Sequence, residues 1–101
     1  MRRLIYLSSA HDDLSDILRY ITRESASLAA GKEFVDKLKQ RCDRLATLPG
    51  THGTARPELR DDLRSTSCQG YVIFFRYRPE CLEIVNIVHG SRDIITYFDE
   101  P

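Results

Sequence analysis

The most regular pattern of apolar positions in the chain is a pair of short runs near its end. Residues 71–75, YVIFF, contain no charged side chain, and apolar residues return at 82–88 after a corner at 76–80. A strand with one face in water alternates apolar and polar residues, whereas an unbroken apolar run indicates cover on both faces. We therefore expect two paired strands at the centre of a sheet.

Apolar residues at helical spacing precede this hairpin. Leu14, Ile17, Leu18 and Ile21 form one stripe, which predicts a helix over about 10–24 with Ser9 as its N-cap. A second stripe predicts a helix that starts after Ser25 or Ser27 and stops at Pro49-Gly50. Gly31 lies on that stripe, either to let the helices approach closely or as a tolerated glycine.

The remaining segments complete the predicted topology. Residues 3–7 and 63–68 fit strands, and residues 49–60 fit a loop. The order β-α-α-β-β-β predicts an α+β fold, one domain over residues 1–101, with the helix hairpin on one face of a mostly antiparallel four-stranded sheet. The second face then needs cover from the apolar tail or from a partner protein, because a large exposed apolar patch usually marks an interface.

Composition narrows the classes of function. The 101 residues include 15 basic and 15 acidic side chains, so no net field attracts a polyanion. Basic residues of the second helix interleave with acidic ones, which is typical of a solvated helix face. The three cysteines lack metal-ligand spacing and predict reduced thiols in a cytoplasmic protein, with no metal or cofactor. No signal peptide or membrane-spanning run is visible.

Several short motifs in register resemble one known family, the ParE branch of the RelE/ParE toxin superfamily of type II toxin–antitoxin modules. The resemblance covers nearly the whole chain. The matching residues are Ala10-His11-Asp12-Asp13-Leu14 with Ile17 and Tyr20, then Leu48-Pro49-Gly50, Gly53, Arg56-Pro57-Glu58-Leu59, Leu63-Arg64, Tyr71–Tyr77 and Ile87–Asp93.

The resemblance implies a toxin that inhibits DNA gyrase without chemistry of its own and is neutralised by a ParD-like antitoxin. It implies contact with DNA only through the antitoxin, and no cofactor or membrane. The alternative within the superfamily is a RelE-type, ribosome-dependent mRNA endoribonuclease. A third interpretation is a decayed module that keeps only antitoxin binding.

Site residues follow from the resemblance and from the expected end of the sheet. As an endoribonuclease the chain would use Arg76, His89, Arg92 and Tyr97, since cleavage through a 2′-hydroxyl needs a base, an acid and cations on the phosphate. A gyrase inhibitor would contact its target through Arg64, Arg76, His89 and Arg92. The antitoxin would contact Tyr71, Ile73, Phe75, Arg76, Ile84, Ile94, Ile95 and Phe98. His89 has a third possible role, in which its ring bonds nearby backbone groups and fixes the exit of the chain.

Overall fold

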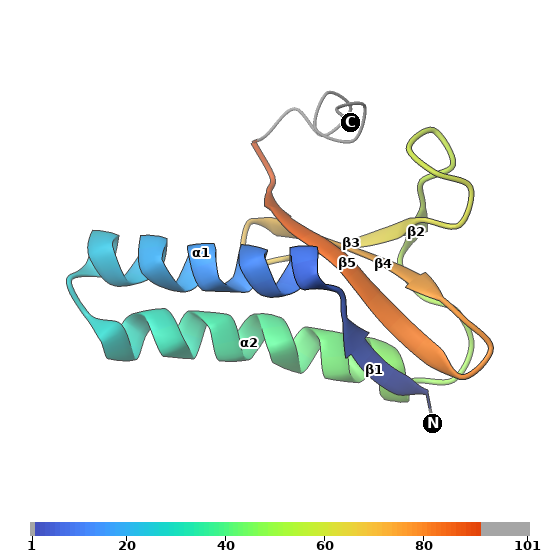
Figure 1. The fold of residues 1–101 in the computed structure, drawn as a ribbon, viewed down its shortest axis with the longest axis horizontal. Coiled ribbons are helices and arrows are strands. Elements are labelled where there is room, and N and C mark those ends of the chain that lie inside the picture. Colours follow the sequence, from blue (N-terminus) through green and yellow to red (C-terminus); the bar gives the residue numbers. More distant parts are fainter. Residues whose placement is uncertain (1, 92–101) are drawn as a thin grey trace.

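A computed structural model describes residues 2–91 as two helices and a five-stranded sheet (Figure 1). The elements are β1 Arg3–Tyr6, α1 Ser8–Ser25, α2 Leu28–Thr47, β2 Thr54–Ala55, β3 Arg64–Cys68, β4 Tyr71–Tyr77 and β5 Cys81–His89. The sheet order is β1-β5-β4-β3-β2, with β1 parallel to β5 and every other pair antiparallel. The predicted α+β class and helix hairpin are confirmed. The extra strand is the two-residue β2, inside the segment expected to be a loop.

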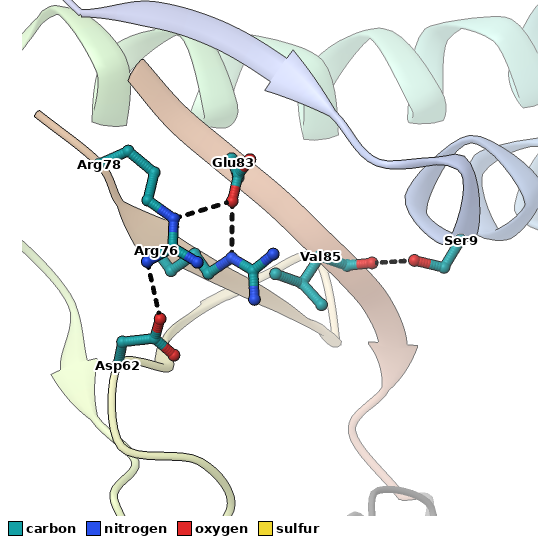
Figure 2. A network of polar contacts seen from close by, with 6 residues as sticks. All are labelled: Ser9, Asp62, Arg76, Arg78, Glu83 and Val85. Atoms are coloured by element: carbon teal, nitrogen blue, oxygen red, sulfur yellow. Dashed lines mark hydrogen bonds and ion pairs between the residues drawn. The ribbon is translucent and has the colours of Figure 1, made fainter. Parts of the chain in front are cut away.

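The two helices begin at different kinds of cap. The side chain of Ser27 accepts a hydrogen bond from Ala30 N at 3.1 Å, so Ser27 is the cap of α2. The prediction that Ser9 caps α1 is wrong, because Leu7 occupies the N-cap position and Ser9 is already helical. Ser9 Oγ instead donates a hydrogen bond to the carbonyl oxygen of Val85 in β5, at 2.6 Å (Figure 2). Its hydroxyl ties α1 to the sheet.

Gly31 lies at a close contact between α1 and α2. A Cβ atom at this position would stand 2.2 Å from Thr22 Oγ1 and 3.1 Å from the carbonyl oxygen of Leu18. Both contacts are shorter than ordinary van der Waals packing allows, and the second involves backbone. Of the two interpretations of Gly31, the close approach of the helices is therefore confirmed.

The main core lies between the helix pair and the sheet. Side chains from the helices and from the sheet meet in this layer, where they are almost completely shielded from water. The larger members are Leu14, Ile17, Val35, Leu38, Leu45, Tyr71, Ile73, Phe75, Leu82, Ile84 and Ile87. Burial of apolar surface of this extent is the dominant favourable contribution to folding.

A second, smaller cluster occupies the opposite face of the sheet. Its buried members are Leu63, Phe74, Val85 and Val88, with Leu7, Leu59 and Val72 packed against them. Leu59 and Leu63 belong to the segment between β2 and β3. The sequence analysis expected the tail or a partner to cover this face, but part of the cover comes from that segment. The apolar tail itself lies outside the described residues.

A β-bulge in β5 explains how its apolar run serves both faces. Phe74 pairs with Asn86 and Phe75 with Ile84, so Val85 is an extra residue on β5. Bulges leave backbone groups without ladder partners. Here Asp13 of α1 accepts hydrogen bonds from Ile87 N and Asn86 Nδ2, each at 2.9 Å. The start of α1 thus bonds one side-chain group and one backbone group of β5 beside the bulge.

Candidate functional site

Four of the predicted antitoxin contacts lie beneath the helices. Ile73, Phe75 and Ile84 are 0% exposed and Tyr71 is 7% exposed, all within the main core. The strand register explains this position, because alternate residues of a strand share a face and these four share the helix-covered one. Their side chains belong to the core between the helices and the sheet. Ile94, Ile95 and Phe98 lie outside the described residues.

Arg76 lies on the opposite face, in a network of charged side chains (Figure 2). It was expected in the corner after the strand, but β4 extends to Tyr77 and places Arg76 across from Glu83 of β5. Arg76 Nε lies 2.6 Å from Glu83 Oε1. Arg78 reaches the same oxygen at 3.3 Å and Asp62 Oδ2 at 3.0 Å. The side chain of Arg76 remains 24% exposed, so it is accessible from outside.

The two arginines determine the protonation of Glu83. The hydrogen bond from Arg76, followed by the charges of Arg76 and Arg78, lowers the pKa of Glu83 despite its desolvation. The carboxylate therefore stays ionised in the folded protein at neutral pH. This carboxylate compensates the positive charges of both arginines, and Asp62 also compensates that of Arg78.

His89 ends β5 and is held locally. Its Nδ1 accepts a hydrogen bond from Ser91 N at 3.2 Å and lies 2.7 Å from Ser91 Oγ. The ring stands edge-on to Tyr71, with 5.2 Å between ring centroids. The structure thus shows the interpretation in which His89 bonds a nearby backbone group where the chain leaves the sheet. Beside it is a groove of about 200 Å³, lined by Asp13, Asp16, Tyr20 and Tyr71 among others. Burial raises the pKa of the Tyr71 hydroxyl.

Arg64 braces a loop at the other side of the sheet. Its Nε donates to the carbonyl oxygen of His52 at 2.7 Å and its Nη2 to that of Gly53 at 2.9 Å. Gly53 has a φ of +75°, and a Cβ there would stand 2.7 Å from the Phe75 ring and from Ser65 O. The glycine lets the loop lie directly against the sheet, where Arg64 reaches it.

The described residues of the predicted target site do not come together. His89 pairs with Tyr71 at one end of β4, whereas Arg76 lies five residues further along that strand. At the rise per residue of a strand this is about 16 Å. Arg64 pairs with Phe75 and bonds the loop beyond the edge of the sheet. The expectation of one polar cluster is wrong for these three residues. Arg92 and Tyr97 lie outside the described part.

The structure reveals a site that sequence reasoning missed, which we call the basic cleft: Arg41, Arg44, His52 and Arg64. A cavity of about 230 Å³ between the end of α2 and the loop before β2 is lined by Arg41, Arg44 and His52. Arg64 donates a hydrogen bond to the carbonyl oxygen of His52 in that loop. The only sequence signal was the basic run of the second helix, which was interpreted as a solvated face. His52 lies in the loop that follows this run, and the sequence did not predict the loop conformation that brings His52 back beside the helix.

Residues 2–91 contain neither a metal-binding cluster nor a membrane-spanning helix. No three His, Cys, Asp or Glu side chains within that range gather closely enough to hold a metal ion. None of the helices in it has the length and apolar character needed to cross a membrane.

The described residues form a helix hairpin on one face of a mostly antiparallel sheet, with polar sites at the edges of the sheet, which places the protein in the α+β class. One solved structure, described as the chromosomal ParDE TA system from P. aeruginosa, has the same fold with a TM-score of 0.74. The match covers 88% of this chain and 96% of the other at 18% identity. No match was found among curated proteins.

The family is given by the sequence. The family model described as the ParE toxin of the type II toxin–antitoxin system parDE matches residues 4–94. The match extends from β1 past the end of β5. This chain belongs to the ParE toxin family.

Proposed function

We propose that this ParE-family protein inhibits DNA gyrase by binding it, and that a ParD-like antitoxin neutralises it. The observation that carries the proposal is the family match across residues 4–94, which includes every described element. Binding requires accessible, correctly placed side chains. It does not require a base, an acid and a phosphate clamp around one bond.

The geometry of the described polar residues supports binding. An endoribonuclease would need His89 and Arg76 within reach of one phosphodiester. They lie about 16 Å apart by strand spacing, and Arg76 is ion-paired with Glu83. Arg64 is engaged with two loop carbonyls. Each of these residues has its own structural neighbours, as separate contact points on a binding surface would.

The antitoxin proposal also concerns particular residues. Arg76 is accessible beside Glu83, and arginine is favoured at interfaces because its planar guanidinium forms paired hydrogen bonds. The tail residues Ile94, Ile95 and Phe98 and the polar residue Arg92 stay proposed contacts that follow from the resemblance. Tyr71, Ile73, Phe75 and Ile84 support this surface from the core.

The test is a supercoiling assay with purified gyrase. We expect the toxin to block supercoiling and to accumulate cleaved DNA complexes. Addition of the protein encoded by the adjacent reading frame should relieve the block. Relaxation of the same plasmid by topoisomerase I is the control, and it should be unaffected.

Two variants separate binding from catalysis. We expect His89→Ala and Arg76→Ala at most to weaken the inhibition of gyrase, because each removes one contact of a binding surface, whereas loss of a catalytic group would abolish cleavage. Unaffected supercoiling without cleaved complexes would refute the proposed target. Codon-linked cuts in translated messages that disappear in His89→Ala or Arg76→Ala would establish the endoribonuclease instead.

A further inference from the structure

The charges of this protein balance in total but not in space. The sequence holds 15 basic and 15 acidic residues. Within residues 2–91, ion pairs engage Arg19, Lys37, Arg56, Arg76 and Arg78. In that same range no carboxylate pairs with Arg41, Arg44 or Arg64 of the basic cleft. Arg41 and Arg44 thus line one cavity without an acidic partner among the described residues, and Arg64 bonds the loop that completes the lining.

The partners of the cleft arginines are neutral. Arg41 Nη1 lies 3.2 Å from Thr66 Oγ1 and 3.2 Å from the carbonyl oxygen of Ser67, and Arg64 bonds two further carbonyls. These acceptors orient the guanidinium groups and leave their positive charge uncompensated. Arg44 is an exposed member of the cavity lining, in the last turn of α2. The cleft therefore favours an anionic group.

The loop that closes the cleft is held in place before any partner arrives. His52 Nε2 lies 2.8 Å from the carbonyl oxygen of Pro49, and His52 N donates to the Tyr77 hydroxyl at 2.9 Å. Arg2 donates to the carbonyl oxygen of Gly50 at 2.9 Å, and its guanidinium lies 4.4 Å from the centre of the Tyr77 ring. A preformed site loses less conformational entropy when it binds.

We infer that the basic cleft binds an acidic segment of the antitoxin, through Asp or Glu side chains that meet Arg41 and Arg44. The inference rests on the proposed function, since it names the partner chemistry of the same complex. Carboxylates match the planar fork of arginine in geometry and charge.

The surroundings of the cleft favour a protein over a nucleic acid. Leu48 lines the cavity and is 38% exposed, one of three large apolar side chains exposed in the described part of the chain. An apolar anchor beside arginines is typical of protein interfaces. A nucleic acid requires a longer basic track that contacts several phosphates, whereas the basic residues that line the cavity are only two arginines and one histidine.

The experiment compares two charge reversals. Arg44→Glu changes the cleft, and Arg23→Glu makes the same change in the last turn of α1, outside the cleft. Both residues are exposed, so both variants should fold, and thermal unfolding checks this. Affinity for the antitoxin encoded by the adjacent reading frame is measured by calorimetry at low and at physiological ionic strength.

We expect Arg44→Glu to weaken antitoxin binding about tenfold or more, with a reduced salt dependence, and Arg23→Glu to stay within about twofold of the unchanged protein. Equal affinities of the two variants would overturn the inference while leaving the antitoxin proposal intact. No binding by the unchanged toxin would overturn both. Binding of a short labelled DNA duplex that Arg44→Glu abolishes would assign the cleft to nucleic acid and refute a protein occupant.

Discussion

Replacement of Gly31 by alanine sets two opposite effects against each other at the contact between α1 and α2. In a solvated helix the change stabilises by about 1 kcal/mol, because glycine loses more backbone freedom on folding. Here the new Cβ would meet Thr22 Oγ1 at 2.2 Å and the Leu18 carbonyl oxygen at 3.1 Å. Overpacking of this kind costs about 1–3 kcal/mol. Because the distance to Thr22 is short and the backbone of Leu18 is immobile, we expect a cost toward the upper end of this range.

The clash therefore outweighs the propensity gain. We expect Gly31→Ala to lower the free energy of unfolding by about 1–2 kcal/mol, which corresponds to a fall in Tm of about 10 °C for a domain of this size. Thermal and urea unfolding followed by circular dichroism measure it. Gln40, exposed in the middle of α2, is the control. The difference in stability between Gln40→Gly and Gln40→Ala measures the helix-propensity difference between glycine and alanine in the same helix, without a clash.

A double-mutant cycle identifies the cause. Thr22 Oγ1 is buried without a hydrogen-bond partner in the structure, so Thr22→Ala removes the clashing atom and breaks no hydrogen bond. Gly31→Ala in that background should recover much of the loss, with a coupling energy of about 1 kcal/mol or more. A stabilised Gly31→Ala protein, matching the Gln40 pair, would refute the close helix contact.

Two further predictions concern ionisable groups. The lowered pKa of Glu83 stabilises the fold above the carboxylate's unfolded pKa, and this contribution disappears as pH falls through the folded pKa. Glu83→Gln should therefore have a lower free energy of unfolding than the unchanged protein at neutral pH. Its free energy of unfolding should fall less between neutral and acidic pH, as unfolding curves at the two pH values would show. Parallel pH profiles of the two proteins would contradict this. Burial raises the pKa of Cys42 to about 12, so iodoacetamide at pH 8 should modify Cys68 and Cys81 well before Cys42, as read by peptide mass spectrometry. Modification of Cys42 in the native protein at a comparable rate would contradict its burial.

The elements with a regular spacing of apolar residues were predictable, because this spacing reflects which side of the element is buried. The stripe from Leu14 to Ile21 predicted α1, and the second stripe with its stop at Pro49-Gly50 predicted α2, which ends at Thr47. The choice of face in the central hairpin was not predictable. When nearly every residue of a strand is apolar, the sequence carries no alternation that tells one face from the other. Ile73 and Phe74 are equally apolar and fully buried, yet they lie in different clusters.

The bulge in β5 was hidden for a related reason. An extra residue shifts the alternation by one, but an apolar run such as Ile84-Val85 shows no shift. Its polar partners, Ser9 and Asp13, lie more than seventy positions away in the sequence. Both residues sit where a helix start favours Ser and Asp, and local reasoning assigned Ser9 to the cap. Their side chains serve the sheet because an unpaired backbone group that is buried costs more than a cap contributes.

The basic cleft shows the limit of composition as a guide to partners. A sum of charges excludes a strong overall field, but it does not describe how acidic and basic groups pair. In this chain Glu83 neutralises Arg76 and, with Asp62, Arg78 on one face. Arg41 and Arg44 line another edge, where Arg41 bonds neutral acceptors and no described carboxylate pairs with either arginine. A neutral protein can thus present a local positive site, since screening in water confines the influence of each charge to about a Debye length. Partner specificity in such a protein depends on that local segregation, which only the folded arrangement reveals.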